Sequence, residues 1–356
     1  MRIYPFFIPH GGCPHACLFC QQSRISGVWA LPSPVAVSTA LERDLPAKGD
    51  GEVAFFGGTF TLLPEERQRD YLRQVSPFIS SGRISGIRIS TRPDAICKGK
   101  TALLKEYGVT TVELGCQSFA PEVLLTARRG HGPESAAGAV ATLREQGMQV
   151  GLQLMPGLPG GDRVEAIFSL QCALDLSPDF LRLYPTVVLK GTGLEAAWRN
   201  GSFEPLSLED AVEWCADLLL LCRGAGVPVI RLGLQATVEL DQGESLVAGP
   251  YHPAFGQLVR SRLWRRAFAL AFGRNGAAEV TVHPADLSDA LGHRRENLHF
   301  LRQGFPLLSI RGQERVARDH FLSGDRLLSL DGLLAGGYPS GSKMDARIVP
   351  MERMLR

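Results

Sequence analysis

The 356-residue sequence lacks any long apolar run. Nothing in it approaches the roughly 20 consecutive apolar residues that a helix needs to span a bilayer. The apolar stretch within the N-terminal MRIYPFFIPHGG is broken by proline and glycine, and it is too short for the core of a signal peptide. We therefore expect a cytoplasmic protein that has no membrane as a partner.

An excess of charge of one sign is also missing, since 38 Lys and Arg face 36 Asp and Glu. The net charge of +2 by itself favours no class of partner. Hydrophobic residues make up 45% of the chain, which argues against disorder and provides for a sizeable core. A chain of this length is expected to form one large domain with a smaller one appended.

Five of the eight cysteines lack a cysteine neighbour, whereas Cys13, Cys17 and Cys20 fall within one short segment. Without a secretory signal, such clustered thiols favour a metal site over a disulfide framework. Free cysteines are usually small buried side chains. We expect burial for the scattered ones, Cys97, Cys116, Cys172, Cys215 and Cys222.

Short β-branched or aromatic runs recur along the chain, and each is followed by a helical pattern. This alternation predicts a parallel sheet with helical crossovers, and so an α/β fold built as a partial (β/α)6-type barrel. A seventh run, Val227 to Leu234, follows a predicted helix at Leu208 to Arg223. The first six predicted strands are Ile3 to Ile8, Val53 to Phe56, Ile87 to Ser90, Thr111 to Leu114, Val150 to Met155 and Phe180 to Tyr184.

Polar and glycine-rich segments follow these strands at their carboxyl ends. In parallel barrels the loops at that end build the active site. We therefore expect one functional face, formed by HGGCPHACLFC, GGTF, STRPD, GCQSF, QLMPGLPGG and YPT in chain order.

The CxxxCxxC segment from Cys13 to Cys20 carries the clearest chemistry. Three thiolates can bind three irons of a cubane and leave the fourth iron without a protein ligand, so that a cofactor can bind there. The alternative is a zinc site completed by His10 or His15. Structural zinc sites usually have two separated ligand pairs, and the sequence holds no second CxxC and no HxxxH.

The CxxxCxxC loop resembles that of the radical S-adenosyl-L-methionine (SAM) superfamily. From Phe7 to Gln235, the segments FFGGTFT, STRPD, ELGCQS, MPGLPG and LYPTVVLKGTGL resemble the radical SAM core of the Elongator catalytic subunit. The resemblance implies a radical SAM barrel with a [4Fe-4S] cluster and SAM as cofactors. It also implies a reductant such as flavodoxin or ferredoxin as a partner. In this chemistry the reduced cluster splits SAM to give a 5'-deoxyadenosyl radical.

The resemblance further implies a place for the methionyl end of SAM. Gly57, Gly58 and Thr59 resemble the superfamily's GGE motif, whose carbonyls accept hydrogen bonds from the methionyl ammonium. Glycines also let a backbone approach a ligand closely. Thr59 replaces the acidic residue of that motif, so we expect the carbonyls to carry more of the binding.

Four more residues are expected at this face. Gln117 follows the fourth strand, where its amide can meet a ribose hydroxyl or the methionyl carboxylate. Arg129 is similar to the arginine that pairs with this carboxylate in coproporphyrinogen-oxidase-like members, and a guanidinium suits a carboxylate bidentately. Gln153 takes the position of an Asp that binds the ribose in related enzymes. Tyr184, in the LYPT segment, is the expected catalytic residue on the substrate side, with barrel packing as the alternative.

The regular alternation fades after residue 235, which is taken as the end of the barrel domain, residues 1–235. Residues 236–345 are predicted to form a smaller α+β domain on the substrate side, and residues 346–356 a tail. The smaller domain is expected to contain a helix near 254–272, a strand near 279–283, helices within 285–302 and a short strand at 306–310.

The Elongator likeness makes a tRNA base the leading substrate class. The Elongator subunit carries an acetyltransferase-like domain after its radical SAM core, and the residues after 235 are too few for one, so carboxymethylation of uridine does not carry over. Two alternatives stay open. One is oxidation of a small molecule, as in oxygen-independent coproporphyrinogen oxidase, and the other is a non-catalytic iron–sulfur protein that binds nucleic acid.

The stretch from Ser245 to Ala278 contains no Asp or Glu. Helical spacing places Leu263 and Leu270 toward the core and the arginines of this stretch partly outward, where a basic helix can hold phosphates. The alternative is that they pair with acids elsewhere in the fold. The arginines are Arg260, Arg262, Arg265, Arg266 and Arg274.

Overall fold

The structure, a computed structural model, describes residues 2–14, 17–272 and 279–335. The chain divides into two compact units, residues 1–259 and residues 260–356. The division falls inside α11 (Phe255–Phe272), whereas the sequence pattern places the domain boundary after residue 235. The predicted tail, residues 346–356, lies outside the described residues.

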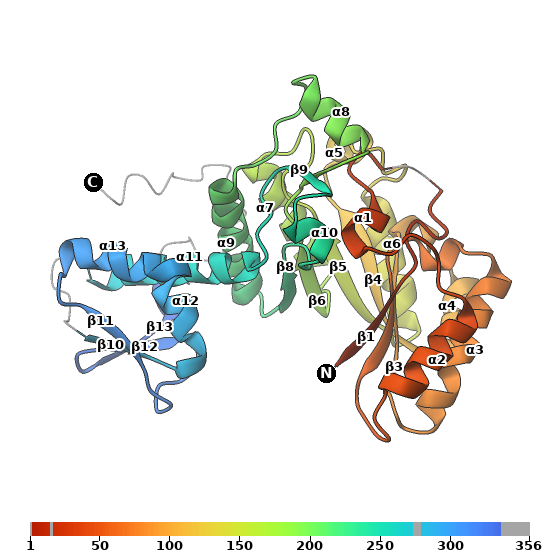
Figure 1. The fold of residues 1–356 in the computed structure, drawn as a ribbon, viewed down its shortest axis with the longest axis horizontal. Helices are drawn as coiled ribbons and strands as arrows, with labels where there is room; N and C mark the ends of the chain where they lie inside the picture. The colour runs from red at the N-terminus through yellow and green to blue at the C-terminus, as the bar shows by residue number, and fades with distance from the viewer. Residues whose placement is uncertain (1, 15–16, 273–278, 336–356) are drawn as a thin grey trace. The chain divides into compact units, whose positions relative to one another are not determined.

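A seven-stranded parallel sheet forms the centre of the first unit (Figure 1). Each strand adds to the same edge, in the order β1-β2-β3-β4-β5-β6-β8, and the sheet curves into a half-barrel. The predicted α/β fold class is confirmed. The strands are β1 (Ile3–Phe7), β2 (Glu52–Phe56), β3 (Gly86–Thr91), β4 (Val109–Gln117), β5 (Gln149–Leu154), β6 (Phe180–Leu183) and β8 (Val229–Leu232).

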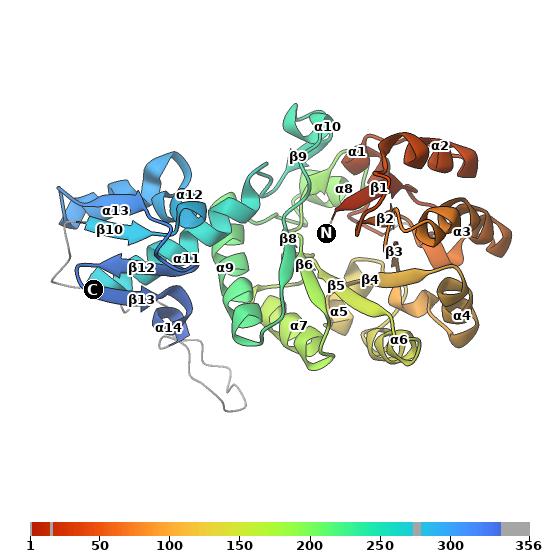
Figure 2. The same cartoon turned by 90° about the horizontal axis from the view of Figure 1, so that it is seen from below.

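Helices cover the outer face of this sheet, as Figure 2 shows for α3, α4, α6 and α7. Capping side chains start several of them. The Asp162 side chain accepts a hydrogen bond from the Glu165 amide at the start of α7, and the Ser207 hydroxyl accepts one from the Asp210 amide at the start of α9. The longer helices are α2 (Pro34–Asp44), α3 (Glu65–Ser80), α4 (Lys98–Glu106), α6 (Glu134–Glu145), α7 (Arg163–Asp175) and α9 (Leu208–Gly224).

Short elements connect the strand ends, and the sequence pattern did not predict them. The two strands β7 and β9 pair antiparallel, outside the main sheet. These elements are α1 (Gln22–Ser26), η1 (Phe60–Leu62), η2 (Pro93–Ala95), α5 (Pro121–Thr126), β7 (Val188–Leu189), α8 (Gly193–Arg199), α10 (Val238–Asp241) and β9 (Leu246–Ala248).

The sheet has an apolar face and a polar face, because successive residues of a strand point to opposite sides. Ile89 and Leu152 of the strands pack with Leu104 and Leu170 of the helices in one buried core. Burial of each such side chain contributes about 1.5–3 kcal/mol. The alternate strand positions carry polar side chains on the inner face of the half-barrel, among them Arg88, Glu113, Gln153, Arg182 and Arg231.

The scattered cysteines follow the expectation of burial only in part. Cys116, Cys215 and Cys222 are buried and Cys172 is half-buried. The expectation is wrong for Cys97, which is exposed. Cys97 is the residue that precedes α4, where the chain enters the helix from the surface and no core reaches its side chain.

The second unit contains a mixed sheet in the order β11-β10-β12-β13. Phe268 of α11 packs edge-to-face on Phe321 of β12, with ring centroids 5.1 Å apart. The hairpin of β12 and β13 has no counterpart in the sequence prediction. The remaining elements are β10 (Glu279–Val282), η3 (Pro284–Asp286), α12 (Leu287–Leu291), η4 (His293–Arg295), α13 (Glu296–Gly304), β11 (Ser309–Gly312), β12 (His320–Ser323), β13 (Arg326–Ser329) and α14 (Leu330–Ala335). Within the described ranges, no helix is long and apolar enough to cross a membrane.

Candidate functional site

The three clustered cysteines lie in the loop between β1 and α1, of which residues 15 and 16 fall outside the described part of the chain. All three thiols are half-buried. The Cys20 amide donates to the Cys17 carbonyl at 3.1 Å, which turns the end of the loop back on itself. Burial raises the pKa of the Cys20 thiol to about 12, and the neighbouring Cys17 and Cys13 thiols add to this rise. The three thiols therefore share one electrostatic environment.

Single metal ions need ligands close together. Among the residues that the structure describes, no group of three or more His, Cys, Asp or Glu side chains is arranged to hold one ion. A cubane differs, because each thiolate binds a separate iron atom. For the zinc alternative, the Nε2 atom of His10 already accepts a hydrogen bond from the Gln22 amide at 3.0 Å. His15 lies outside the described residues.

The turn after β2 packs directly against the cysteine loop. The Thr59 amide donates to the Gly11 carbonyl at 2.7 Å, and the Thr59 hydroxyl oxygen lies 3.4 Å from the Cys13 sulfur. Gly58 has a φ of +62°, and a Cβ added to it would lie 2.3 Å from the Gly11 oxygen, so the position requires glycine. Gly57, with a φ of +77°, is also in the left-handed region. The turn and the loop therefore meet backbone to backbone.

Gln22, which sequence reasoning missed, ties the same two segments together. Its side-chain oxygen accepts hydrogen bonds from the backbone amides of His10 and Gly58, each at 2.6 Å. One side chain thus holds the start of the cysteine loop and the turn after β2 at a fixed separation. A glutamine near a cysteine motif carries no sequence signal for this role, because both of its partners are backbone groups.

Gln117 and Gln153 meet at the carboxyl ends of β4 and β5. The Gln153 side chain donates to the Gln117 side-chain oxygen at 3.1 Å. Gln117 is buried and has a φ of +72°, a conformation that costs energy for a residue other than glycine. The pairing of β4 with β5 shifts register between Gly115 and Gln117, which turns this side chain toward its partner. The structure thus brings these two predicted residues together.

Arg129 is buried beside the cysteine loop, just after α5. Its guanidinium donates to the Cys17 sulfur at 3.2 Å and to the Gly115 carbonyl at 2.5 Å. Its Nε atom is buried, with no hydrogen-bond partner among the described residues. Burial raises the pKa of the Cys13 thiol, and the Thr59 hydroxyl and the positive charge of Arg129 partly offset that rise. Arg129 therefore favours the thiolate form, which binds metal.

Arg92 and His131 add to the surroundings of the loop. Arg92 is buried and forms an ion pair with Asp94 at 2.9 Å, and its charge also lowers the pKa of Cys13 against the effect of burial. Burial lowers the pKa of His131. The His131 Nε2 atom is buried without a hydrogen-bond partner within the described ranges. The positive charge near the cysteine loop therefore comes from arginine side chains, because the lowered pKa of His131 favours its neutral form.

Tyr184, the expected catalytic residue, lies directly after β6 and is half-buried. Its hydroxyl accepts a hydrogen bond from Arg182 at 3.2 Å. Burial raises the pKa of the phenol, and the charges of Arg182 and Arg231 oppose this rise. In the described part of the chain, no side-chain hydrogen bond joins Tyr184 to the predicted cofactor residues. Tyr184 is near them only because β6, which it follows, pairs with β5, the strand that contains Gln153.

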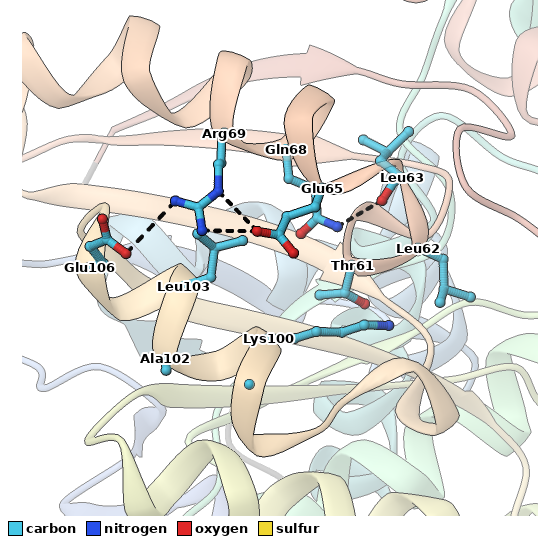
Figure 3. A pocket seen from close by; sticks show the side chains of 11 residues that line it. Thr61, Leu62, Leu63, Glu65, Gln68, Arg69, Lys100, Ala102, Leu103 and Glu106 are labelled. Atoms are coloured by element: carbon cyan, nitrogen blue, oxygen red, sulfur yellow. Dashed lines mark hydrogen bonds and ion pairs between the residues drawn. The ribbon is translucent and has the colours of Figure 1, made fainter.

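A cavity of about 520 Å³ lies elsewhere, between η1, α3 and α4 (Figure 3). Lys100 points across it, and Arg69 pairs with Glu65 at 2.9 Å on one wall. None of the predicted site residues lines this cavity. The candidate site is therefore the face formed by the strand ends rather than this cavity.

The basic helix of the sequence analysis is α11, and its predicted orientation is wrong in two places. Arg262 and Arg266 are buried, and each interacts with other groups of the protein. Leu270, expected in the core, is 48% exposed. The buried stripe of the helix is centred on Trp264 and Phe268 instead, which rotates the buried face away from Leu270.

Arg260 fits the alternative of pairing with an acid, whereas Arg265 contacts an aromatic ring instead. Arg260 forms an ion pair with Asp289 at 2.7 Å, and the Arg265 guanidinium stacks over the Phe300 ring at 4.2 Å. Arg274 lies outside the described residues. This helix consequently gives no support to binding of a nucleic acid.

Comparison with protein families identifies two regions of the chain. The radical SAM superfamily matches residues 7–169, which include the cysteine loop, the turn after β2 and Gln117. The radical SAM C-terminal domain matches residues 178–265, which include Tyr184.

Individual relatives are similar over the same part. Elongator complex protein 3 of Mus musculus is 32% identical over 190 residues, 48% of this chain and 35% of that protein. The tRNA uridine(34) acetyltransferase of Methanocaldococcus infernus is 35% identical over 137 residues, 37% of this chain and 25% of that protein. The chain thus spans about a third or less of these relatives. The structure of the archaeal Methanocaldococcus infernus Elp3, with an N-terminal deletion, has a TM-score of 0.57 at 23% identity and covers 74% of this chain and 62% of that one, which shows the shared fold.

Replacement of Gln22 tests how the site is assembled. Gln22→Ala removes the acceptor of two backbone amides, each bond worth about 1 kcal/mol. We expect faster hydrogen–deuterium exchange at the amides of His10 and Gly58, with a small loss of thermal stability. Gln21→Ala is the matched control, because within the described ranges the Gln21 side chain forms its hydrogen bond with the His10 ring rather than with a backbone amide. Equal protection of both amides in the two variants would contradict the role of Gln22.

Proposed function

Because the chain belongs to the radical SAM superfamily, we propose that this enzyme holds a [4Fe-4S] cluster on Cys13, Cys17 and Cys20 and uses it to cleave SAM reductively. The resulting 5'-deoxyadenosyl radical would act on a tRNA base. The observation that carries the proposal is the packing of the three-thiol loop against the turn after β2, with the Arg129 guanidinium 3.2 Å from the Cys17 sulfur.

The residues present suit such a cluster by their chemistry. Three thiols are the donors that iron–sulfur clusters take, and a set of three leaves one iron open for SAM. The charges of Arg92 and Arg129 favour the thiolate forms. When bound and reduced, the cluster supplies the electron that splits the sulfonium of SAM. The protein's own task is to hold the two cofactors in place and to keep the radical away from water.

The proposed SAM site uses residues from the ends of three strands, β2, β4 and β5, and one residue that follows α5. The carbonyls of Gly57, Gly58 and Thr59 would accept hydrogen bonds from the methionyl ammonium. The Gln117 and Gln153 pair, already joined at 3.1 Å, would bind the ribose hydroxyls without adding charge. Arg129, whose Nε has no partner in the described structure, would pair with the methionyl carboxylate.

The substrate proposal is a tRNA base, reached from the side of Tyr184. It rests on relatives, one of which bears the name tRNA uridine(34) acetyltransferase. Because the similarity covers 25% of that relative, we do not extend the acetyl transfer in its name to this chain. We propose a flavodoxin or ferredoxin as the electron donor. A small-molecule substrate, as in coproporphyrinogen oxidation, is the alternative outcome of the test.

Loss of one loop cysteine should abolish the cluster. We expect about four irons and four sulfides per chain after anaerobic reconstitution, and a large loss of both in Cys17→Ala, because two corners of the cubane would then lack a protein ligand. Cys97→Ala, which removes an exposed thiol outside the loop, should keep the full iron content. Stoichiometric zinc in the parent protein would contradict the proposal.

Arg129→Ala should weaken SAM binding while iron is retained. A charge-assisted contact of this kind is worth about 2 kcal/mol, roughly a thirtyfold loss of affinity. Anaerobic equilibrium binding measures it, and iron analysis of the same sample checks the cluster. The neighbouring Arg128→Ala is the matched control, since Arg128 is exposed. Unchanged SAM affinity in Arg129→Ala would refute the assignment.

The substrate class is tested with total tRNA. Anaerobic incubation of the reconstituted protein with SAM, dithionite and tRNA, followed by mass spectrometry of the digested nucleosides, should reveal a modified nucleoside. The Cys17→Ala protein should produce none. If SAM is cleaved while every nucleoside keeps its mass, the tRNA proposal fails and a small-molecule substrate takes its place.

A further inference from the structure

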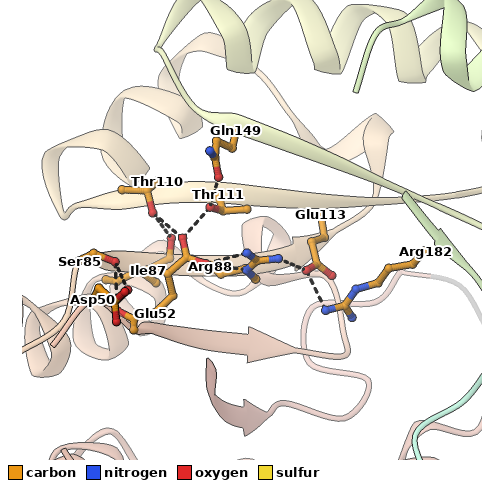
Figure 4. Close-up of polar contacts among 11 residues, drawn as sticks. Asp50, Glu52, Ser85, Ile87, Arg88, Thr110, Thr111, Glu113, Gln149 and Arg182 are labelled. Carbon is orange, nitrogen blue, oxygen red and sulfur yellow. Dashed lines mark hydrogen bonds and ion pairs between the residues drawn. The ribbon is translucent and has the colours of Figure 1, made fainter. Parts of the chain in front are cut away.

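A chain of buried ion pairs crosses the inner face of the half-barrel (Figure 4). Arg88 of β3 binds Glu52 of β2 at 2.7 Å and Glu113 of β4 at 2.8 Å. Arg182 of β6 binds the same oxygen of Glu113 at 2.9 Å. The side chains of Glu52, Arg88 and Glu113 are at most 6% exposed. Four strands are thus joined beneath the proposed cofactor site.

We call these four residues, Glu52, Arg88, Glu113 and Arg182, the ladder. Its contribution to the stability of the fold does not explain why it is present. Burying charges costs desolvation energy that their attraction roughly offsets, so apolar side chains of the same volume would serve a core equally well. Arg88 and Arg182 also stack over the rings of Phe180 and Phe56, at 4.9 and 4.8 Å. The guanidinium groups are therefore held in fixed positions, which suits a positioning role.

The fixed end of the ladder orients the Tyr184 phenol. Arg182 donates to the phenol oxygen at 3.2 Å, so that oxygen acts as the acceptor in this bond. The hydroxyl proton of Tyr184 must then point elsewhere, and the described residues offer it no acceptor. The Tyr184 hydroxyl can consequently donate a hydrogen bond to a bound ligand.

The charges around the phenol do not cancel. Arg231 of β8 is in register with Arg182, so both side chains leave the same face of the sheet. Its guanidinium donates to the Gln235 side-chain oxygen, a neutral partner, and forms no ion pair within the described ranges. The guanidinium groups of Arg88, Arg182 and Arg231 therefore outnumber the carboxylates of the ladder, which are those of Glu52 and Glu113. Among these described residues, the positive charge without a carboxylate partner is that of Arg231, whose side chain is half-buried and whose charge acts on the Tyr184 phenol.

The position of this charge relative to the cofactor site follows from strand register. Gln153 is in register with Arg182, and Arg182 with Arg231. A ligand that contacts the phenol and Arg231 would therefore lie on the strands next to the proposed ribose site.

We propose that the Tyr184 hydroxyl and the Arg231 guanidinium form a subsite for an anionic oxygen of the substrate, a phosphate or a carboxylate, and that Arg182 is the positioning residue that orients the phenol. The subsite rests on the proposed function for its role, because it specifies the substrate of that same site. A phosphate fits a nucleic-acid substrate, and a carboxylate fits a small organic acid. Both groups accept a hydrogen bond from a phenol and a bidentate contact from a guanidinium.

The test is a titration of the full-length protein, without SAM, with inorganic phosphate and separately with acetate. The probe is the NMR signal of ¹³C-labelled tyrosine, and Tyr184→Phe identifies the Tyr184 resonance among six tyrosines. We expect a saturable shift of this resonance with at least one anion. Saturation by phosphate alone assigns a phosphoryl group, and saturation by acetate alone assigns a carboxylate.

Variants separate the subsite from general charge effects. Arg231→Gln should weaken anion binding at least tenfold, whereas Arg231→Lys, which keeps the charge but not the bidentate geometry, should weaken it less. Lys190→Gln, which removes an exposed positive charge after β7, should bind as the parent does. Arg182→Met should raise the pKa of the Tyr184 phenol further, because a charge that opposes the rise is lost.

The proposal is overturned if neither anion gives a saturable shift, or if Arg231→Gln titrates as the parent does. Since the titration needs no SAM, its failure leaves the cluster proposal intact. Failure of the parent protein to bind iron would instead count against the cluster proposal and not against the anion subsite. It removes the proposed function, while a saturable shift in the same protein would still establish the anion subsite.

Discussion

The contact between the Thr59 amide and the Gly11 carbonyl is the constraint on which the site depends. It brings the turn after β2 and the cysteine loop so close that Gly58 has no room for a Cβ. The same approach sets the Thr59 hydroxyl beside the Cys13 sulfur and lets Gln22 bridge both segments. The first thiol and the proposed methionyl site are therefore one rigid assembly, which a flexible loop on its own could not provide.

The second requirement is a sheet with two different faces. Its outer face is apolar and binds the helices, which leaves the inner face free to carry charge. On that inner face the chemistry changes with position along the strands. Ion pairs fill the interior around Arg88, and the Gln117 and Gln153 pair lies at the strand ends. Because parallel strands end on the same side, the residues after them meet without any special loop architecture.

Features that depend on local pattern were predictable from the sequence. Strand positions follow from β-branched runs, and the cysteine spacing marks a three-thiol loop. Gln117 and Gln153 were each expected at the face formed by the strand ends, but their hydrogen bond was not predicted, because it accompanies an irregular register before Gln117 that the pattern does not show. The superfamily and the α/β fold are confirmed, whereas the individual ligand roles of these residues stay predictions until they are measured.

Features that depend on distant partners were not predictable. Gln22 works through backbone amides far apart in the chain. The ladder requires four strands, β2, β3, β4 and β6, to lie in one sheet before its side chains can meet. The face of α11 was predicted wrongly for a related reason. Arginines alternate with apolar residues there, so the spacing allows several faces, and tertiary packing around Trp264 and Phe268 decides which one is buried.

The central claim is that three thiols hold a cluster with one iron open to SAM. Mössbauer spectroscopy of the ⁵⁷Fe-reconstituted protein, before and after addition of SAM, tests it most directly. The account predicts a cubane spectrum in which SAM shifts the signal of one iron site among four, because only that site lacks a thiolate. A spectrum that SAM leaves unchanged, or a protein that takes up zinc and no iron, would contradict it.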